Sequence, residues 1–167
     1  MHTTAYWLTI PASVMGVLPY ASDDRRDGVV GLGFALKQVA QLLLMCDGHD
    51  IGISIDSGET DGGQSAAASP QKIFVYDNYP GGIGFSAPLY EVHRELLTGT
   101  RRLIAECQCE NGCPACVGPA GNTGPMAKTA ALRILDLLLD VPARLPDDGT
   151  AGMAGSEHAG DAEVVPF

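Results

Sequence analysis

Residues 107–116, with the sequence CQCENGCPAC, place four of the five cysteines of this chain within ten positions. The spacing is CxC, then three residues, then CxxC. Four thiolates that can reach one point are donors well suited to a tetrahedral zinc ion. Gly112 and Pro114 favour the sharp turns that such a compact loop needs. The sequence therefore predicts one metal site with the four ligands Cys107, Cys109, Cys113 and Cys116.

Three other interpretations of the cysteine cluster are open from the residues alone. An iron–sulfur cluster uses the same four thiolates. Reduced core thiols or disulfides are a second possibility, although an odd number of cysteines and the lack of export signals favour metal. A catalytic zinc would need an open position and normally uses histidine or carboxylate ligands, whereas four thiolates saturate the ion. We therefore expect a structural zinc site, with an iron–sulfur cluster as the alternative.

The fifth cysteine and the histidines are not expected to bind the metal. Cys46 ends a leucine-rich run and is interpreted as a small buried hydrophobic residue. The histidines are scattered, and none has ligand spacing to a cysteine pair. They are His2, His49, His93 and His158, of which His93 is a remote alternative ligand.

The apolar residues around the cysteines predict a small mixed α/β (α+β) domain. Residues 29–46 and 126–141 repeat apolar residues at three- and four-residue spacing, as helices with one buried side do. Residues 86–106 have a similar pattern, with a break or kink expected at Gly99. Short strands are predicted at 5–11, 51–55 and 72–76. We expect a few strands packed on three to four helices, with the cysteine loop joining the last two helices.

Composition divides the chain into a domain, residues 1–142, and an acidic tail, residues 143–167. Small residues without apolar periodicity predict a flexible loop at 57–70 inside the domain. The tail holds five acidic side chains and one basic side chain, and we expect it to be disordered. No stretch approaches the roughly 20 apolar residues of a membrane span, and the first residues lack the features of a signal peptide. We expect a cytoplasmic protein without membrane contact.

The formal net charge of −10 disfavours autonomous binding of duplex DNA, because an acidic protein repels a polyphosphate. A stand-alone nucleic-acid-binding module would depend on the basic residues of the domain. The candidate phosphate contacts are Lys72, Arg94, Arg101, Arg102, Lys128 and Arg133.

Two glycine-containing segments suggest phosphate-binding loops but lack the defining residues. The segment DNYPGGIG, residues 77–84, has neither GxGxxG nor GxxxxGK[ST], and Asp77 would repel an anion. We interpret it as a structural turn. Residues 124–129 approach a Walker A motif, but Asn122 and Ala127 stand where it requires glycine. With no DEAD or DEAH box in the sequence either, the chain is not expected to be an enzyme by itself.

The segments YDNYPGGIGFS (76–86) and CQCENGCPACVGP (107–119), followed by a leucine-rich helix, resemble the zinc-binding domain (MZB, DUF1998) of MrfA/YprA-type DNA helicases. Residues 2–11 and 31–52 also follow the order of that family, so the resemblance covers most of residues 3–142. It implies that the four cysteines bind zinc. It also implies that the domain forms the C-terminal part of a superfamily-2, ATP-dependent helicase linked to DNA repair.

The resemblance implies helicase motor domains, or a motor subunit, as the partner, with DNA bound in that context. The chain lacks the two motor domains, so ATP hydrolysis is not expected of it. We expect a gene fragment, a separately encoded subunit or the product of a late internal start, acting as a non-catalytic accessory domain. The alternative is a stand-alone, zinc-dependent nucleic-acid-binding module. A metal-dependent hydrolase would need a non-thiolate ligand, which the cysteine loop does not supply.

Overall fold

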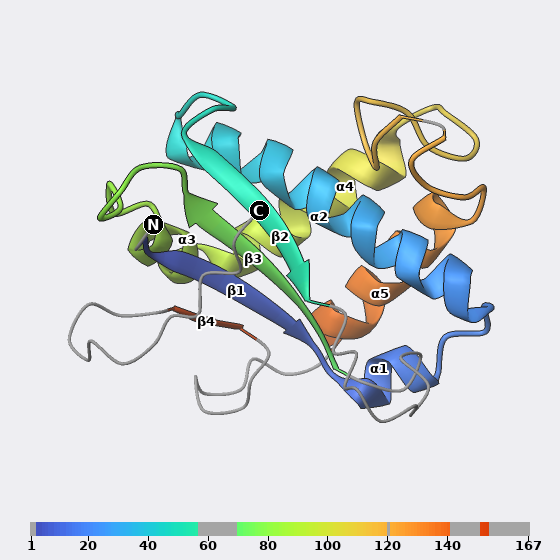
Figure 1. The fold of residues 1–167 in the computed structure, drawn as a ribbon. Helices are drawn as coiled ribbons and strands as arrows, with labels where there is room; N and C mark the ends of the chain where they lie inside the picture. The colour runs from blue at the N-terminus through green and yellow to red at the C-terminus, as the bar shows by residue number, and fades with distance from the viewer. Residues whose placement is uncertain (1–2, 57–69, 120, 141–150, 154–167) are drawn as a thin grey trace.

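An antiparallel sheet with helices packed behind it forms the domain in the computed structural model (Figure 1). The structure describes residues 3–56, 70–119, 121–140 and 151–153. Within these ranges the strand order is β2-β3-β1-β4. The strands are β1 (Ala5–Ile10), β2 (Ile51–Asp56), β3 (Gln71–Asp77) and β4 (Ala151–Met153). The helices are α1 (Ala12–Gly16), α2 (Ser22–Leu44), α3 (Ser86–Glu91), α4 (His93–Glu106) and α5 (Ala127–Asp140).

Alternation along β1 and β3 gives the sheet one buried face. On β1 the side chains of Tyr6, Leu8 and Ile10 are buried, and the residues between them are half-buried. The antiparallel pairing of β1 with β3 sets Tyr6 opposite Val75 and Leu8 opposite Ile73, which are buried too. Because paired residues project to the same face of a sheet, these side chains form one apolar layer. The strands predicted at 5–11, 51–55 and 72–76 are confirmed as β1, β2 and β3.

The central helix is α2, which packs against α5, α4 and β2. Leu32, Ala35 and Leu36 are fully buried on it. Gly28 lies so close to α5 that a Cβ at this position would stand 2.6 Å from the Cβ of Ala130. A glycine at this position therefore allows the two helices to approach each other closely.

By length and mean hydropathy, α2 is apolar enough to cross a membrane, so the prediction that no stretch approaches a membrane span is wrong. Half of its apolar window is buried inside the domain. The contacts with α4, α5 and the sheet give those apolar residues a protein environment. The packing identifies α2 as a core helix.

Two predicted helix boundaries are wrong. The first helix begins at Ser22 rather than at residue 29, because its first turn carries Asp23 and Asp24, which favour a helix N-terminus without adding to the apolar pattern. The predicted break at Gly99 is absent, since α4 runs through it, and the helical segment is divided at Val92 instead. At Gly99 a Cβ would stand 3.0 Å from Val39 of α2, so the glycine serves helix packing.

The predicted class, a small mixed α/β (α+β) domain, is confirmed. The described residues contain five helices because 86–106 is divided into α3 and α4 and because the short α1 was not predicted. Most of the predicted loop at 57–70 lies outside the described residues. The same holds for most of the predicted tail at 143–167, of which residues 151–153 form β4 beside β1.

Candidate metal centre

The four clustered cysteines lie on the loop between α4 and α5, as the sequence predicts, and their sulfur atoms meet. The Sγ of Cys107 is 3.5 Å from those of Cys109 and Cys113. The Sγ of Cys116 is 3.4 Å from that of Cys109 and 3.7 Å from that of Cys113. A disulfide would bring two sulfur atoms to about 2.05 Å, so these are free thiols.

The sulfur positions fit a tetrahedral ion. With Zn–S bonds of about 2.3 Å, the sulfur atoms of a tetrahedral zinc site stand about 3.8 Å apart. The four Sγ atoms all lie within 4.8 Å of one another. In the part of the chain that the structure describes, no histidine or carboxylate joins this group. The donor set is therefore four sulfur atoms, which is the set of a closed structural site.

The other candidates stand apart from the cluster. Cys46, His49 and His93 do not belong to the group of donors that the described residues form. Burial, with the nearby carboxylate of Asp50 as the next cause, raises the pKa of the Cys46 thiol. His2 and His158 lie outside the described residues.

The thiols of the cluster differ in their affinity for protons. Burial, followed by a hydrogen bond with Cys109, raises the pKa of Cys116 to about 12. A hydrogen bond from the backbone of Cys109, followed by one from the thiol of Cys113, lowers the pKa of Cys107 to about 7. Because a metal ion binds thiolates, its binding to this cluster must release protons.

The loop turns back on itself around the carbonyl of Cys113, which accepts hydrogen bonds from the N–H groups of Cys116 (3.0 Å) and Gly118 (3.1 Å). Gly112 has a φ of 135°, and a Cβ there would also stand 2.6 Å from a methyl group of Val117. The glycine predicted to allow a sharp turn is therefore required by its backbone and by its surroundings.

One side of α2 supports the second half of the loop. Gly31 faces the buried Val117, and a Cβ on the glycine would stand 2.9 Å from the Cβ of the valine. About two turns further along the helix, the Nε2 of Gln38 donates to the carbonyls of Pro114 and Cys116, both at 3.4 Å. These contacts tie the CxxC pair to the core of the domain.

Lys128, in the first turn of α5, holds the first half of the loop. Its Nζ donates to the carbonyls of Cys107 and Cys109, both at 2.6 Å. The ammonium group of Lys128, a candidate phosphate contact, is thus engaged by two carbonyls of the domain itself. For the same reason, the lysine of the Walker A-like segment at 124–129 does not act as the phosphate-binding lysine of that motif would. No sequence signal indicated this role, since the lysine is far along the chain from both cysteines.

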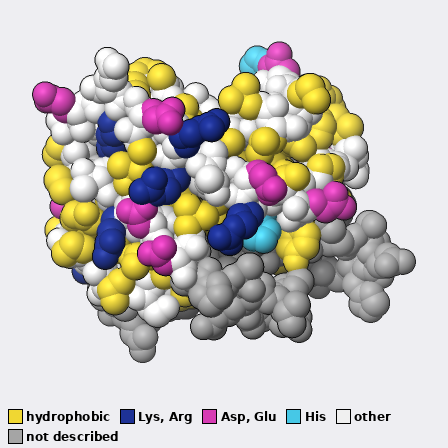
Figure 2. Space-filling view, turned by 180° about the vertical axis from the view of Figure 1, so that it is seen from behind, with side chains coloured by type: hydrophobic (Ala, Val, Ile, Leu, Met, Phe, Trp, Pro, Cys, Tyr) yellow, Lys and Arg dark blue, Asp and Glu magenta, His cyan; other side chains and the backbone are white. Residues whose placement is uncertain are grey.

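The other basic candidates are spread over the surface among acidic residues. Arg101 of α4 is paired with Asp136 of α5, Nε to Oδ1 at 2.5 Å. The view from behind the sheet shows Lys and Arg side chains interspersed with Asp and Glu (Figure 2). This face therefore does not form a continuous basic surface of the kind that binds a nucleic acid backbone. The remaining candidates, all on β3, α4 or α5, are Lys72, Arg94, Arg102 and Arg133.

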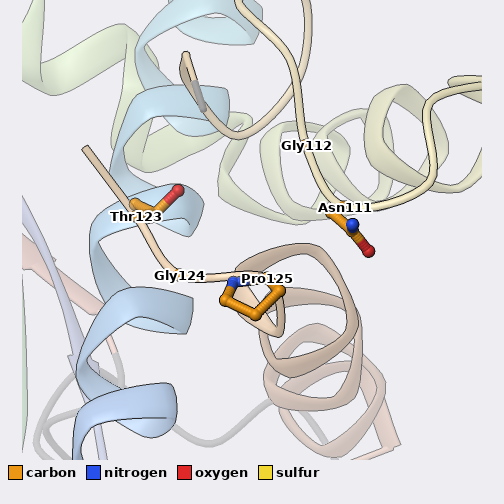
Figure 3. A pocket seen from close by; sticks show the side chains of 5 residues that line it. All are labelled: Asn111, Gly112, Thr123, Gly124 and Pro125. Carbon is orange, nitrogen blue, oxygen red and sulfur yellow. The ribbon is translucent and has the colours of Figure 1, made fainter. Parts of the chain in front are cut away.

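A hollow of about 190 Å³ lies between the cysteine loop and the segment that leads into α5 (Figure 3). Its lining residues are Asn111, Gly112, Thr123, Gly124 and Pro125. None of these side chains titrates, so the hollow offers no acid–base or metal chemistry.

The glycine-rich segment after β3 is organised by its own carboxylate. Asp77 is 1% exposed. Its Oδ2 accepts hydrogen bonds from the N–H groups of Ile83 (2.5 Å), Gly84 (2.9 Å) and Phe85 (3.5 Å), and from the hydroxyl of Thr4 (3.3 Å). Backbone N–H groups of the kind that cradle a phosphate thus already surround an anion. This geometry agrees with the interpretation of the segment as a structural turn.

The fold and the cysteine cluster together define a small zinc-binding α/β domain. Residues 32–117, more than half of the chain, match the family model of the MrfA Zn-binding domain, MZB. The chain belongs to this family, and the resemblance drawn from its motifs is confirmed.

Two curated relatives extend the match. YprA of Bacillus subtilis (strain 168), described as an uncharacterized ATP-dependent helicase, is 28% identical over 136 residues, which are 81% of this chain and 17% of YprA. The uncharacterized protein MJ1572.1 of Methanocaldococcus jannaschii is 37% identical over 70 residues, which are 40% of this chain and 62% of that protein.

Solved structures of a helicase contain the same fold. The crystal structure of the DUF1998 helicase MrfA bound to DNA aligns with 72% of this chain, at a TM-score of 0.59 and 25% identity. The structure of MrfA bound to DNA and AMPPNP aligns with 79% of this chain, at a TM-score of 0.56 and 26% identity. In both cases the chain spans 15% of the helicase. The match to YprA likewise covers a minor part of that helicase.

Proposed function

We propose that this chain is a non-catalytic accessory domain in which zinc is held by four thiolates. The supporting observation is the meeting of four sulfur atoms within 4.8 Å in a member of the MrfA Zn-binding family. When bound, zinc would supply four metal–sulfur bonds that cross-link the loop, and it would leave no open position for a substrate. The proposed ligands are Cys107, Cys109, Cys113 and Cys116. The family favours zinc over an iron–sulfur cluster.

The domain, residues 1–142 with an acidic tail at 143–167, is proposed to act with the motor of an ATP-dependent DNA helicase involved in DNA repair. The matched relatives YprA and MrfA are helicases, of which this chain covers 15–17%. ATP hydrolysis and translocation would belong to the motor, since the sequence has neither a Walker A motif nor a DEAD or DEAH box. The domain would brace the motor or shape the DNA path, in the cytoplasm, as part of a longer chain or as a separate subunit.

The alternative, a stand-alone nucleic-acid-binding module, has less support. Of its six candidate phosphate contacts, Lys128 is bound to backbone carbonyls and Arg101 is paired with Asp136. The net charge of −10 works against binding as well.

The metal content of freshly purified protein tests the first proposal. We expect a colourless protein with about one zinc ion per chain, as a closed four-thiolate site requires. A brown protein that contains iron would indicate an iron–sulfur cluster instead of zinc. A protein without metal would contradict the metal site.

Association with a motor tests the second proposal. The probe is YprA of Bacillus subtilis expressed without the segment that matches this chain, here called the YprA motor. Analytical ultracentrifugation of the mixture should show a complex with the zinc-loaded domain. Two species that sediment separately at all concentrations would contradict the proposal.

A further inference from the structure

One end of the domain exposes four large apolar side chains on two neighbouring segments. The exposed fractions are 75% for Leu42, 93% for Met45, 44% for Tyr79 and 55% for Ile83. Leu42 and Met45 lie where α2 leads into β2, and the other two lie on the loop between β3 and α3. Figure 1 shows both segments at the end of the molecule away from the cysteine loop. We call these four residues the apolar cap.

Hydrogen bonds hold the two segments of the apolar cap together. The backbone N–H of Asn78 donates to the carbonyl of Asp50 at 2.9 Å, and its Nδ2 donates to the carbonyl of His49 at 2.8 Å. The hydroxyl of Tyr79 donates to the Oδ1 of Asp50 at 2.9 Å. These bonds join the two segments, so the segments that carry the cap are held next to each other.

Met45 gives the strongest indication that the apolar cap is a binding surface. Among the described residues it is the non-glycine residue with positive φ, at 51°. It ends α2 in a Schellman arrangement, with its N–H directed to Leu42 and the N–H of Cys46 directed to the carbonyl of Gln41. Glycine suits this position better, because a Cβ crowds the backbone there. The methionine is nevertheless present, and its side chain gains almost no contact within the domain.

We propose that the apolar cap is the surface on which this domain docks against a helicase motor. This inference rests on the proposed function. The matched helicases YprA and MrfA continue for most of their length beyond the part that this chain covers, and we take that remaining part as the partner of the cap. Methionine and tyrosine are enriched in protein interfaces, and local strain is concentrated at functional sites.

The charges around the cap define the chemistry of the partner surface. Asp47 and Asp50 border the apolar side chains, and the chain as a whole carries a net charge of −10. Carboxylates at this position repel nucleic acid phosphates and attract a basic rim. The partner surface is therefore a protein surface with an apolar centre and basic residues around it.

The test compares variants for binding to the YprA motor by titration calorimetry. The double variant Leu42→Glu, Ile83→Glu places charge at both segments of the cap, and we expect its affinity to fall by at least about tenfold, as for central interface residues. The matched control is Val17→Glu, which changes an apolar side chain that is 63% exposed outside the cap, and its affinity should stay within about twofold. Melting curves and zinc content confirm that each variant is folded.

The outcomes separate the docking surface from the proposed function. Equal affinities of the wild type and the double variant would overturn the cap as the docking surface and leave motor binding in place. Lack of binding by the wild type would overturn both. If the double variant binds the motor as the wild type does but binds single-stranded DNA more weakly than the wild type, the cap binds nucleic acid, and the protein partner is wrong.

Discussion

Two loops of this domain are built around opposite charges. The loop at 107–116 collects four sulfur donors, which as thiolates repel one another until a cation joins them. The loop at 77–85 collects backbone N–H groups and supplies the anion itself, the carboxylate of Asp77. Both use positive-φ glycines to bring their groups inward. The first loop depends on an ion from solution, whereas the second is complete within the chain.

Because only the cysteine loop depends on an ion, we expect metal chelation to destabilise that loop and to leave the loop at 77–85 unchanged. We expect Cys113→Ser, or treatment of the wild type with EDTA, to abolish cooperative melting or lower the midpoint strongly. Structural zinc sites contribute on the order of 10 kcal/mol to small domains, and the cysteine loop packs on the core helix α2. Circular dichroism melting with and without EDTA measures the effect. Cys46→Ser is the matched control, because Cys46 lies outside the cluster; an unchanged midpoint for Cys113→Ser contradicts the zinc site.

The second loop should respond to loss of its carboxylate and not to chelation. Asp77→Ala leaves the N–H groups of Ile83, Gly84 and Phe85 without their acceptor, and hydrogen bonds to a charged group contribute about 1.5–3 kcal/mol, so a loss of about 3 kcal/mol is expected. Urea denaturation measures it. Zinc content should stay at the wild-type value. A variant that loses zinc along with stability would show that the two loops are not independent.

A smaller effect is expected from the contact that completes the first loop. Lys128→Met keeps the length of the side chain and removes the donor to two carbonyls beside the ligands. Groups that orient metal ligands affect metal affinity by about 10–100-fold, so zinc should pass to a competing chelator at least about tenfold faster. Arg133→Met on the same helix is the control. Equal release rates for both variants would leave Lys128 with no role at the metal site.

The smallest expected change in stability is an increase. Met45→Gly relieves the left-handed backbone at the end of α2, and glycine at such a position is favoured by about 1 kcal/mol. The melting midpoint should therefore rise while affinity for the YprA motor falls. A variant that is less stable than the wild type would show that the methionine serves the fold instead of a partner.

The sequence predicted those features that depend on neighbours along the chain. The cysteines are close in sequence, and the helical and strand patterns are local, so the zinc loop and most elements could be found. The continuity of α4 through Gly99 could not, because it depends on the approach of Val39 from α2. The role of Asp77 was predicted only in part. Its charge disfavours an external anion, as expected, but the carboxylate itself also occupies the position that such an anion would take. Lys128 depends on a contact across the loop that no spacing encodes.

The position of α2 has a mechanical consequence. Its middle carries Gly31 and Gln38 against the cysteine loop, and its last turn carries Leu42 of the apolar cap. A continuous helix of 23 residues is about 35 Å long and stiff along its axis. A force applied at the cap would tilt α2 as a whole, with little bending, and would so be transmitted to the metal loop. A chelator that loosens the metal loop would then also loosen the last turn of α2. Loss of zinc would therefore weaken partner binding at the apolar cap, which the metal does not contact.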